Sequence, residues 1–226
     1  MTARPRLLDL FCCAGGASMG YHLAGFDVVG VDNRPQPNYP FTFHQGDALE
    51  FLAAHGDRFD AIHASPPCHD HTPLANVVGH DGTGWLLDAT RTALDILGRP
   101  YVIENVPGAD MPGAVTLCGT EFGLHTDTAT RGRVWLRRHR RFESNRLLMG
   151  AGGCYCHTKR GRIIGVYGTG DSGQGHGWKG SFTDRQTVMG IDWMTREELS
   201  QAIPPAMTRF IGEQLLAALI PTGGAR

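Results

Sequence analysis

The sequence has no long apolar run, and none of its hydrophobic stretches approaches the roughly 20 residues that a membrane-spanning helix needs. At its start, polar and acidic residues follow almost at once, a pattern unlike that of a secretory leader, so we expect a cytoplasmic protein. In that compartment the six cysteines stay reduced. A formal net charge of −1 excludes a long-range attraction of the whole molecule for nucleic acid, so any such contact must be local.

Length and composition bound the fold class. The 226 residues suit one large α/β domain, or one domain with a small insertion, and a hydrophobic content of 41% allows a real core. A chain of this length hardly accommodates two full-sized domains. The sequence shows no internal repeat.

Short apolar runs alternate with segments of helical periodicity along the first half of the chain. Each predicted strand ends at polar or small residues, as Val28 to Val31 does at Asp32-Asn33. This alternation predicts a mostly parallel sheet with helices on both faces, in which ligands bind beyond the carboxyl ends of the strands. The other predicted elements are strands from Leu7 to Phe11, Phe59 to Ala64 and Tyr101 to Ile103, and helices ending at Leu23, spanning Trp85 to Leu97 and following Pro204-Pro205.

The chain from Asn145 to Asp184 has a different character. Glycine is dense there, apolar periodicity is lost, and only Ile163 to Tyr167 resembles a strand. We therefore predict a catalytic and cofactor-binding domain over residues 1–144 and a short glycine-rich insertion over residues 145–184. A C-terminal segment over residues 185–226 then returns to the catalytic domain.

A glycine turn follows the first predicted strand, where Asp9-Leu10-Phe11 leads into Gly15-Gly16. Glycine has no Cβ, so such a turn lets the backbone approach a ligand closely, although the spacing is not that of the dinucleotide fingerprint. At the end of the second strand Asp32 can accept both hydroxyls of a ribose, and Asp47 can accept from an adenine amino group. Taken singly, either carboxylate is more often a turn or helix-cap residue. Together these residues predict an adenosyl ligand.

A second group of residues suits chemistry on a pyrimidine ring. Cytosine C5 is a poor nucleophile, so methylation there needs a group that first adds to C6, and the thiolate of Cys68 after Pro66-Pro67 can do so. At the end of the next strand Glu104 can hold N3 as a carboxylic acid, and Arg138 or Arg140 can stabilise the adduct electrostatically. A lone cysteine is more often a small buried hydrophobe, so the combination carries the prediction.

Basic residues crowd into one part of the chain. A cluster of this kind can bind a phosphate backbone, and a solvated basic face is an equally good interpretation of it. The cluster comprises Arg131, Arg133, Arg137, Arg138, His139, Arg140, Arg141, Arg146, Lys159, Arg160 and Arg162.

These residues, in this order, resemble the motifs of the cytosine-C5 DNA methyltransferase family over nearly the whole chain. Asp9-Leu10-Phe11 with Gly15-Gly16 is similar to the first motif, Pro67-Cys68 to the catalytic loop, and Glu104-Asn105-Val106 to the glutamate motif. More loosely, the chain resembles the short orphan methyltransferases of bacteriophages and prophages. The remaining matches are Arg138-His139-Arg140 to the eighth motif, Met189-Gly190-Ile191 to the ninth and Ala202-Ile203-Pro204-Pro205 to the tenth.

The resemblance implies a Rossmann-like S-adenosylmethionine-dependent methyltransferase fold and transfer of a methyl group from S-adenosylmethionine to C5 of a cytosine flipped out of double-stranded DNA. It also implies a monomer that acts in the cytoplasm, or in the host cytoplasm if a phage encodes it, with no membrane partner. The implied catalytic residues are Cys68, Glu104, Asn105, Arg138 and Arg140; the cofactor-binding residues are Asp9, Phe11, Gly15, Gly16, Asp32, Asn33, Asp47, Ala48, Pro66 and Gln201; and the DNA-binding residues are His69, Arg137, Arg141, Arg160 and Arg162.

Several positions depart from the family's pattern. His69 follows the cysteine where glutamine is usual, Leu136 replaces glutamine in the eighth motif, and Ser200-Gln201 replaces glycine and asparagine in the tenth. The insertion is also far shorter than the family's usual target-recognition domain, so we expect short or loose sequence selectivity. Two alternatives stay open: a related pyrimidine-C5 transferase acting on RNA or on a modified base, and a catalytically silent DNA-binding relative.

Cys154, Cys156 and His157 raise the question of a zinc site, which Cys118 or another residue would complete. Their spacing is tighter than the common two-residue gap between paired zinc ligands, so we predict no bound metal. The His69-Asp70-His71 run beside the cysteine is more economically interpreted as a proton shuttle or as loop polarity than as a metal centre.

Overall fold

The computed structural model describes residues 3–67, 85–159, 162–168 and 178–219. Three residues with predicted roles, Cys68, His69 and Arg160, lie outside these ranges. None of the helices in the described part of the chain combines the length and the apolar character that crossing a membrane requires.

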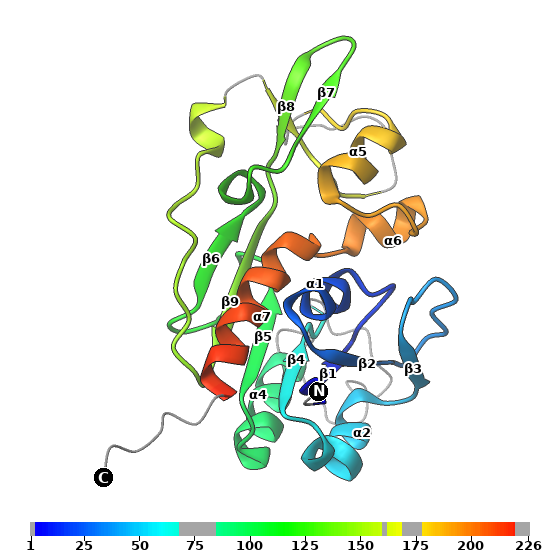
Figure 1. The fold of residues 1–226 in the computed structure, drawn as a ribbon, viewed down its shortest axis with the longest axis vertical. Helices are drawn as coiled ribbons and strands as arrows, with labels where there is room; N and C mark the ends of the chain where they lie inside the picture. The colour runs from blue at the N-terminus through cyan, green and yellow to red at the C-terminus, as the bar shows by residue number, and fades with distance from the viewer. Residues whose placement is uncertain (1–2, 68–84, 160–161, 169–177, 220–226) are drawn as a thin grey trace.

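A seven-stranded sheet forms the centre of the molecule, in the order β3-β2-β1-β4-β5-β9-β6 (Figure 1). The strands from β3 to β5 run parallel, β9 runs antiparallel to β5, and β6 pairs antiparallel with β9. The mostly parallel sheet predicted from the sequence is therefore confirmed. Its strands are β1 (Arg6–Leu10), β2 (Asp27–Asp32), β3 (Thr42–Gln45), β4 (Ala61–Ala64), β5 (Tyr101–Asn105), β6 (Val115–Cys118) and β9 (His139–Ser144).

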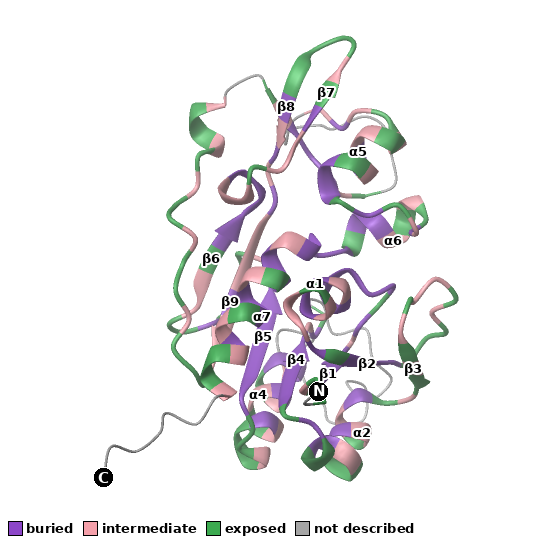
Figure 2. Ribbon diagram, in the orientation of Figure 1, coloured by how far each residue is buried: buried purple, intermediate pink, exposed green. Residues whose placement is uncertain are grey.

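Helices cover both faces of this sheet, as predicted. On one face α1 (Gly16–Ala24) and α7 (Pro205–Leu219) pack over a core that includes Leu7. On the other face α2 (Ala48–His55) and α4 (Trp85–Leu97) pack over a core that includes Leu8. Neighbouring residues of a strand point to opposite faces, so Leu7 and Leu8 belong to different cores. Because both faces are covered, β4 and β5 are buried along their whole length (Figure 2).

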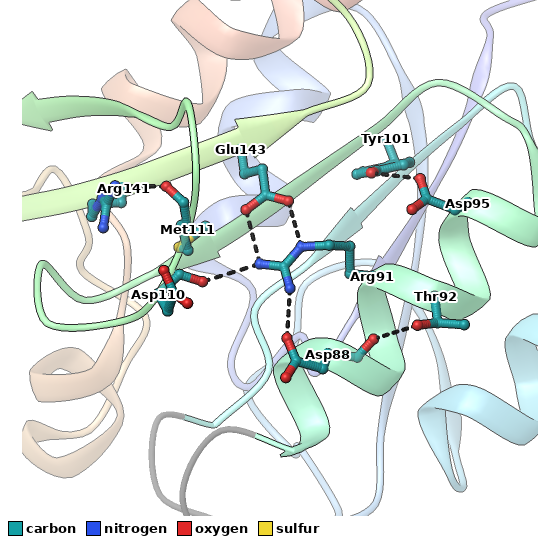
Figure 3. Close-up of polar contacts among 9 residues, drawn as sticks. All are labelled: Asp88, Arg91, Thr92, Asp95, Tyr101, Asp110, Met111, Arg141 and Glu143. Carbon is teal, nitrogen blue, oxygen red and sulfur yellow. Dashed lines mark hydrogen bonds and ion pairs between the residues drawn. The ribbon is translucent and has the colours of Figure 1, made fainter.

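A network of ion pairs fastens α4 to the antiparallel edge of the sheet (Figure 3). The guanidinium of Arg91 pairs with Glu143 of β9 at 2.6 Å and with Asp88 one helical turn away at 2.6 Å. It also donates to the carbonyl oxygen of Asp110, in the segment that follows β5, at 3.1 Å. A bidentate guanidinium–carboxylate pair is directional, so this network fixes α4 against β9 and against the segment that follows β5.

A smaller three-stranded sheet lies beyond the central one. β7 (His125–Thr128) and β8 (Gly132–Leu136) form an antiparallel hairpin, and β10 (Ile163–Ile164) pairs with β8 in parallel. The hairpin projects away from the central sheet at the end where α5 (Phe182–Met189) and α6 (Arg196–Gln201) lie (Figure 1). A separate apolar cluster, which includes Val134, Ile164, Val188 and Leu199, joins this sheet to the two helices.

The smaller sheet takes strands from both sides of the boundary predicted at residue 144. β7 and β8 precede that boundary and β10 follows it, while α5 runs across the boundary predicted at residue 184. The predicted segments 1–144, 145–184 and 185–226 therefore do not coincide with the two sheets. A short hairpin carries no signal of its own for the sheet that it joins, because that choice depends on pairing with β10 across a long stretch of sequence.

Candidate active site at the carboxyl edge of the central sheet

The strand order changes direction between β1 and β4, which makes this point a topological switch point. Chain connections leave β1 toward β2 on one side and return to β4 on the other, and ligands of doubly wound sheets bind beyond the strand ends at such a switch point. The segments that leave the sheet there are residues 11–15 after β1 and residues 65–67 after β4. The second segment starts beside the end of β1, because the backbone N–H of Ser65 donates to the carbonyl oxygen of Leu10 at 3.1 Å.

The turn between β1 and α1 holds unusual backbone angles. Phe11 has φ 59° and Cys13 has φ 44°, and within the described residues they are the only non-glycine residues with positive φ. Gly15 follows with φ 81° and caps the start of α1. Side chains other than glycine adopt this region at a cost of about 1–3 kcal/mol, and such residues cluster at functional sites. The turn that the sequence assigns to cofactor binding is thus the strained part of the backbone.

Asp32 at the end of β2 is tied to this turn. Its carboxylate oxygens accept hydrogen bonds from the backbone N–H groups of Cys13 and Arg34, each at 3.0 Å. A carboxylate offers about four acceptor sites, so two bonds leave Asp32 able to accept more. Asp32 is nearly buried, and its exposed neighbour Asn33 continues the same edge. This placement fits the predicted contact with a ribose.

Asp9 lies beneath the turn, wholly buried in β1. The hydroxyl of Ser18 donates to its Oδ2 and also contacts the hydroxyl of Tyr39 at 2.8 Å. Oδ1 of Asp9 has no hydrogen-bond partner among the described residues. Burial raises the pKa of Asp9 to about 7, with a smaller contribution in the same direction from the charges of Asp32 and Glu104. The carboxyl group is therefore poised to carry a proton near neutral pH.

Three residues predicted to bind the cofactor have structural roles in the described chain, and a fourth is exposed. Asp47 caps α2, since its Oδ1 accepts from the N–H groups of Leu49 and Glu50, and the helix-cap alternative is confirmed. Ala48 lies in the apolar core behind that cap. A Cβ on Gly16 would come within 2.7 Å of the carbonyl oxygen of Ile203, so this glycine serves the packing of α1. Gln201 is exposed at the end of α6.

Glu104 lies near the end of β5, one strand beyond β4. It is 5% exposed, and Nε of Arg140 lies 2.9 Å from its Oε1. The two atoms form an ion pair, but the N–H of Arg140 is not aligned for a hydrogen bond. Oε1 therefore has no hydrogen-bond donor among the described residues. Burial raises the pKa of Glu104, whereas Arg140, Arg138 and a hydrogen bond from Ser65 act in the opposite direction. A buried oxygen without a donor, beside a cation, suits a carboxyl group that binds a substrate atom.

A chain of hydrogen bonds that was not predicted from the sequence runs from Tyr21 through His63 to Ser65, whose side chain hydrogen-bonds to Glu104. Nε2 of His63 lies 2.9 Å from the hydroxyl of Ser65, and Nδ1 lies 2.9 Å from the hydroxyl of Tyr21. Burial lowers the pKa of His63 to about 3, so the ring is neutral, with one nitrogen as donor and the other as acceptor. The sequence carries a signal for this contact. His63 and Ser65 stand two positions apart at the end of a predicted strand, and side chains at this spacing share a face.

Asn105 joins this acid to the segment that leads to the predicted nucleophile. Its side-chain Nδ2 donates to the carbonyl oxygen of Pro66 at 2.9 Å, and its Oδ1 accepts from the N–H of Val106. Cys68 itself, and His69 after it, lie outside the described residues. Their roles stay predictions, and the structure places only the start of their segment, Pro66-Pro67, at the edge that carries Glu104.

The arginines in and beside β9 bind different partners. Arg138 is buried and donates to the carbonyl oxygens of Val166 and Ser200, so it holds the connection between β8 and β9 against the segment after β10 and against α6. Arg141, predicted to contact DNA, donates instead to the carbonyl oxygens of Ala109 and Met111, on the side of the sheet where Arg91 lies (Figure 3). Arg140 is thus the member of the motif that faces Glu104.

Two of the predicted DNA contacts, Arg137 and Arg162, lie beside strands of the smaller sheet. Arg137 follows β8 and is half-buried, and Arg162 is exposed just before β10. Arg160 falls outside the described residues. Two further basic residues of the cluster are engaged locally, since Arg133 pairs with Asp127 and Arg131 lies over the ring of Trp178.

Comparison with known proteins finds no family model that matches the chain. Two curated proteins match part of it: the Type II methyltransferase M.FnuDI of Fusobacterium nucleatum, 28% identical over 112 residues, and the Type II methyltransferase M.XorII of Xanthomonas oryzae, 29% identical over 122 residues. Each match covers 46% of this chain, and 33% and 29% of the respective relatives. The match thus spans about a third of the length of these curated relatives.

Solved structures match over nearly the whole chain. Dnmt2 methyltransferase of S. pombe superposes with a TM-score of 0.66 at 12% identity, covering 96% of this chain and 100% of that one. The methyltransferase EhMeth of Entamoeba histolytica superposes with a TM-score of 0.62 at 10% identity, covering 96% and 99%. The chain has the Rossmann-like methyltransferase fold. This likeness confirms the predicted fold class and, at such low identity, concerns the fold alone.

Proposed function

We propose that this protein is a DNA cytosine-C5 methyltransferase that uses S-adenosylmethionine and forms a covalent adduct through Cys68. One observation carries the proposal. Glu104 is buried at the carboxyl edge of the sheet, its Oε1 has no hydrogen-bond donor in the described part of the chain, and its neighbour Asn105 holds the start of the segment that leads to Cys68. The partial matches to two proteins named Type II methyltransferases support it further.

The chemistry follows from the weak nucleophilicity of cytosine C5. The thiolate of Cys68 adds to C6, and the C5=C6 electron pair moves to C5, which then attacks an electrophilic methyl group. Glu104, as a carboxylic acid, donates a hydrogen bond to N3 and stabilises the negative charge that addition places on the ring. Loss of the C5 proton to a base then expels the thiolate and restores the double bond. Arg140 beside Glu104 adds positive charge at this stage.

The turn after β1 and the end of β2 fit an adenosyl group. S-adenosylmethionine supplies the electrophilic methyl group when it is bound. The free acceptor capacity of Asp32 suits the ribose hydroxyls, and the strained turn from Phe11 to Gly15 brings backbone groups close to the ligand. Oδ1 of Asp9, which has no hydrogen-bond partner in the part of the chain that the structure describes, lies under the same turn and can accept from the ligand or carry a proton toward it.

Double-stranded DNA is the proposed substrate, with the target base flipped out of the helix. Flipping costs a few kcal/mol of stacking and pairing, which contacts to the phosphate backbone must offset. Arg137 and Arg162 on the smaller sheet, with Arg160 nearby in sequence, are the proposed contacts. Arg141 is withdrawn from this set, because its guanidinium is engaged with carbonyl oxygens inside the protein.

A methyl-transfer assay tests the proposal. Purified protein is incubated with isotopically labelled S-adenosylmethionine and either mixed-sequence duplex DNA or transfer RNA, and the modified nucleoside is identified by mass spectrometry. We expect 5-methyldeoxycytidine in DNA. Label in RNA alone would shift the substrate to RNA, and DNA binding without transfer to either substrate would indicate a catalytically silent relative.

A further inference from the structure

Four potential metal ligands meet at one point outside the site described above. They are Cys118 at the end of β6, His139 at the start of β9, and Cys154 and Cys156 in the segment that follows β9. One ligand atom from each residue lies within 4.8 Å of all the others. We infer that these residues bind a zinc ion as a closed, structural Cys₃His site.

The spacing of the ligand atoms matches a tetrahedral ion. Zinc bonds of about 2.3 Å to sulfur and about 2.0–2.1 Å to nitrogen separate ligand atoms by roughly 3.5–3.8 Å. Nε2 of His139 lies 3.3 Å from Sγ of Cys154 and 3.8 Å from Sγ of Cys156, and the two sulfurs are 3.1 Å apart. Small shifts of the side chains bring all of these separations to the tetrahedral values.

The fold brings the ligands together through two strands and one turn. Cys118 and His139 are paired partners in the antiparallel ladder of β6 and β9, so their side chains lie on the same face of the sheet. The Cys-x-Cys turn then closes over them, with the N–H of Cys156 directed at the sulfur of Cys154 at 3.4 Å. Hydrogen bonds of this kind to sulfur stabilise a thiolate over a thiol.

A second layer of contacts holds the ligands in place. The hydroxyl of Thr120 donates to the sulfur of Cys118 at 3.4 Å and lies 3.8 Å from the sulfur of Cys154. It also accepts from the backbone N–H of Tyr155 at 3.1 Å, between the two other cysteines. Residues that orient metal ligands in this way are a regular feature of metal sites. All the members of the cluster are at least partly buried, and Cys118 is wholly buried.

The donor set favours zinc over other ions. Soft thiolate ligands with one imidazole in a tetrahedral arrangement select zinc, whereas calcium, magnesium and manganese prefer oxygen ligands. Four protein ligands leave no open position, so the site is structural rather than catalytic. In a reducing compartment the three thiols also stay available for a metal rather than for disulfides.

This assignment changes two expectations from the sequence. No metal was expected, and His157 was the histidine considered; in the structure His157 is exposed on the short helix η3 (Cys156–Thr158), while His139 completes the cluster. His139 lies in the chain between Arg138 and Arg140. A zinc ion there would therefore fix the strand that presents Arg140 to Glu104, and would fasten residues 145–159 to the central sheet.

Metal analysis tests this inference without any activity measurement, so its outcome is independent of the proposed function. Protein expressed in zinc-supplemented medium is desalted and its metals are quantified by mass spectrometry, with thiols kept reduced. We expect about one zinc per chain in the wild type. Cys156→Ser and His139→Ala should lose most of this zinc and melt at a lower temperature. His157→Ala is the matched control and should keep the zinc.

A spectroscopic measurement on the wild type covers the case in which those variants do not fold. Replacing zinc by cobalt(II) should give visible bands of a tetrahedral ion together with thiolate-to-cobalt charge-transfer absorption. Soluble wild-type protein with reduced thiols and no zinc, a disulfide between Cys154 and Cys156 in reduced preparations, loss of zinc in His157→Ala, or iron in place of zinc would each overturn the assignment.

Discussion

The side-chain amide of Asn105 donates a hydrogen bond to the carbonyl oxygen of Pro66 over 2.9 Å. Asn105 ends β5 and Pro66 follows β4, so this single bond joins the strand end that carries Glu104 to the segment that leads to Cys68. Both residues are buried, and the carbonyl would lose a donor if the amide were removed. The bond thus makes Asn105 a positioning residue for the proposed acid and nucleophile.

Replacing Asn105 by alanine should therefore lower turnover more than binding. A buried carbonyl without its donor costs about 1–3 kcal/mol, so we expect kcat to fall roughly 10- to 100-fold while the Kd for S-adenosylmethionine stays within about twofold. The measurement is single-turnover methyl transfer together with calorimetric titration of the cofactor.

Asn145 offers a matched control for this substitution. Its side chain also bridges backbone groups, since it accepts from the N–H of Tyr101 and donates to the carbonyl oxygen of Arg99, but at the opposite end of β5. Asn145→Ala should lose a comparable amount of stability and keep its turnover. Equal losses of turnover in the two variants would mean that Asn105 acts through stability alone.

Replacing Glu104 by glutamine should remove an acid while keeping the shape of the side chain. We expect turnover to fall by about 10²- to 10⁴-fold, with nearly unchanged affinity for the cofactor. Burial raises the pKa of Glu104, so the wild-type rate should also fall as the pH rises through that raised pKa, and the variant should lack this dependence. Glu143→Gln is the control, because Glu143 pairs with Arg91 on the other face of the sheet (Figure 3).

Asp9 should make the free energy of unfolding depend on pH. Its pKa is about 7 in the folded protein against 3.8 for an ordinary aspartate, so between these values the folded state binds more protons than the unfolded state. Stability associated with Asp9 is then fully present below about pH 4 and is lost as the pH rises through about 7.

Asp9→Asn removes this loss, since a neutral amide does not ionise in this pH range and its oxygen can still accept from the hydroxyl of Ser18. The stability gain of the variant over the wild type should be near zero at pH 4 and reach at most roughly 4 kcal/mol above pH 7. Urea unfolding at a series of pH values measures it. The lowered pKa of His63 also makes stability depend on pH, but it does so equally in the wild type and the variant and cancels when their free energies of unfolding are subtracted. A gain that does not change with pH would contradict the raised pKa.

Much of the central fold could be predicted from local patterns. The helix Trp85–Leu97 has the predicted bounds, because its apolar residues recur at helical spacing, and β2 and β5 end at the predicted polar residues Asp32 and Asn105. These features depend on neighbouring residues in the chain. Asp32 and Glu104 were proposed as site residues for the same reason, as they are the polar ends of apolar strands.

Features that depend on distant pairing could not be predicted. The hairpin β7–β8 joins β10 rather than the central sheet, and Arg141 turns toward the carbonyl oxygen of Met111 rather than toward solvent. The partner of Cys154 and Cys156 is His139, which strand pairing brings beside Cys118. In each case the sequence shows a residue capable of several contacts, and only the packed strands select one.

The central claim is that the sulfur of Cys68 bonds to C6 of a cytosine in DNA, and mechanism-based trapping tests it most directly. Duplex DNA of varied sequence containing 5-fluorocytosine is incubated with S-adenosylmethionine and the protein, and covalent complexes are detected on denaturing gels. With fluorine at C5 there is no proton for a base to remove. Elimination of the thiolate therefore stalls after methyl transfer. We predict a complex that needs the cofactor in the wild type and is absent in Cys68→Ser. No complex with the wild type, or an equal one with Cys68→Ser, would contradict the account.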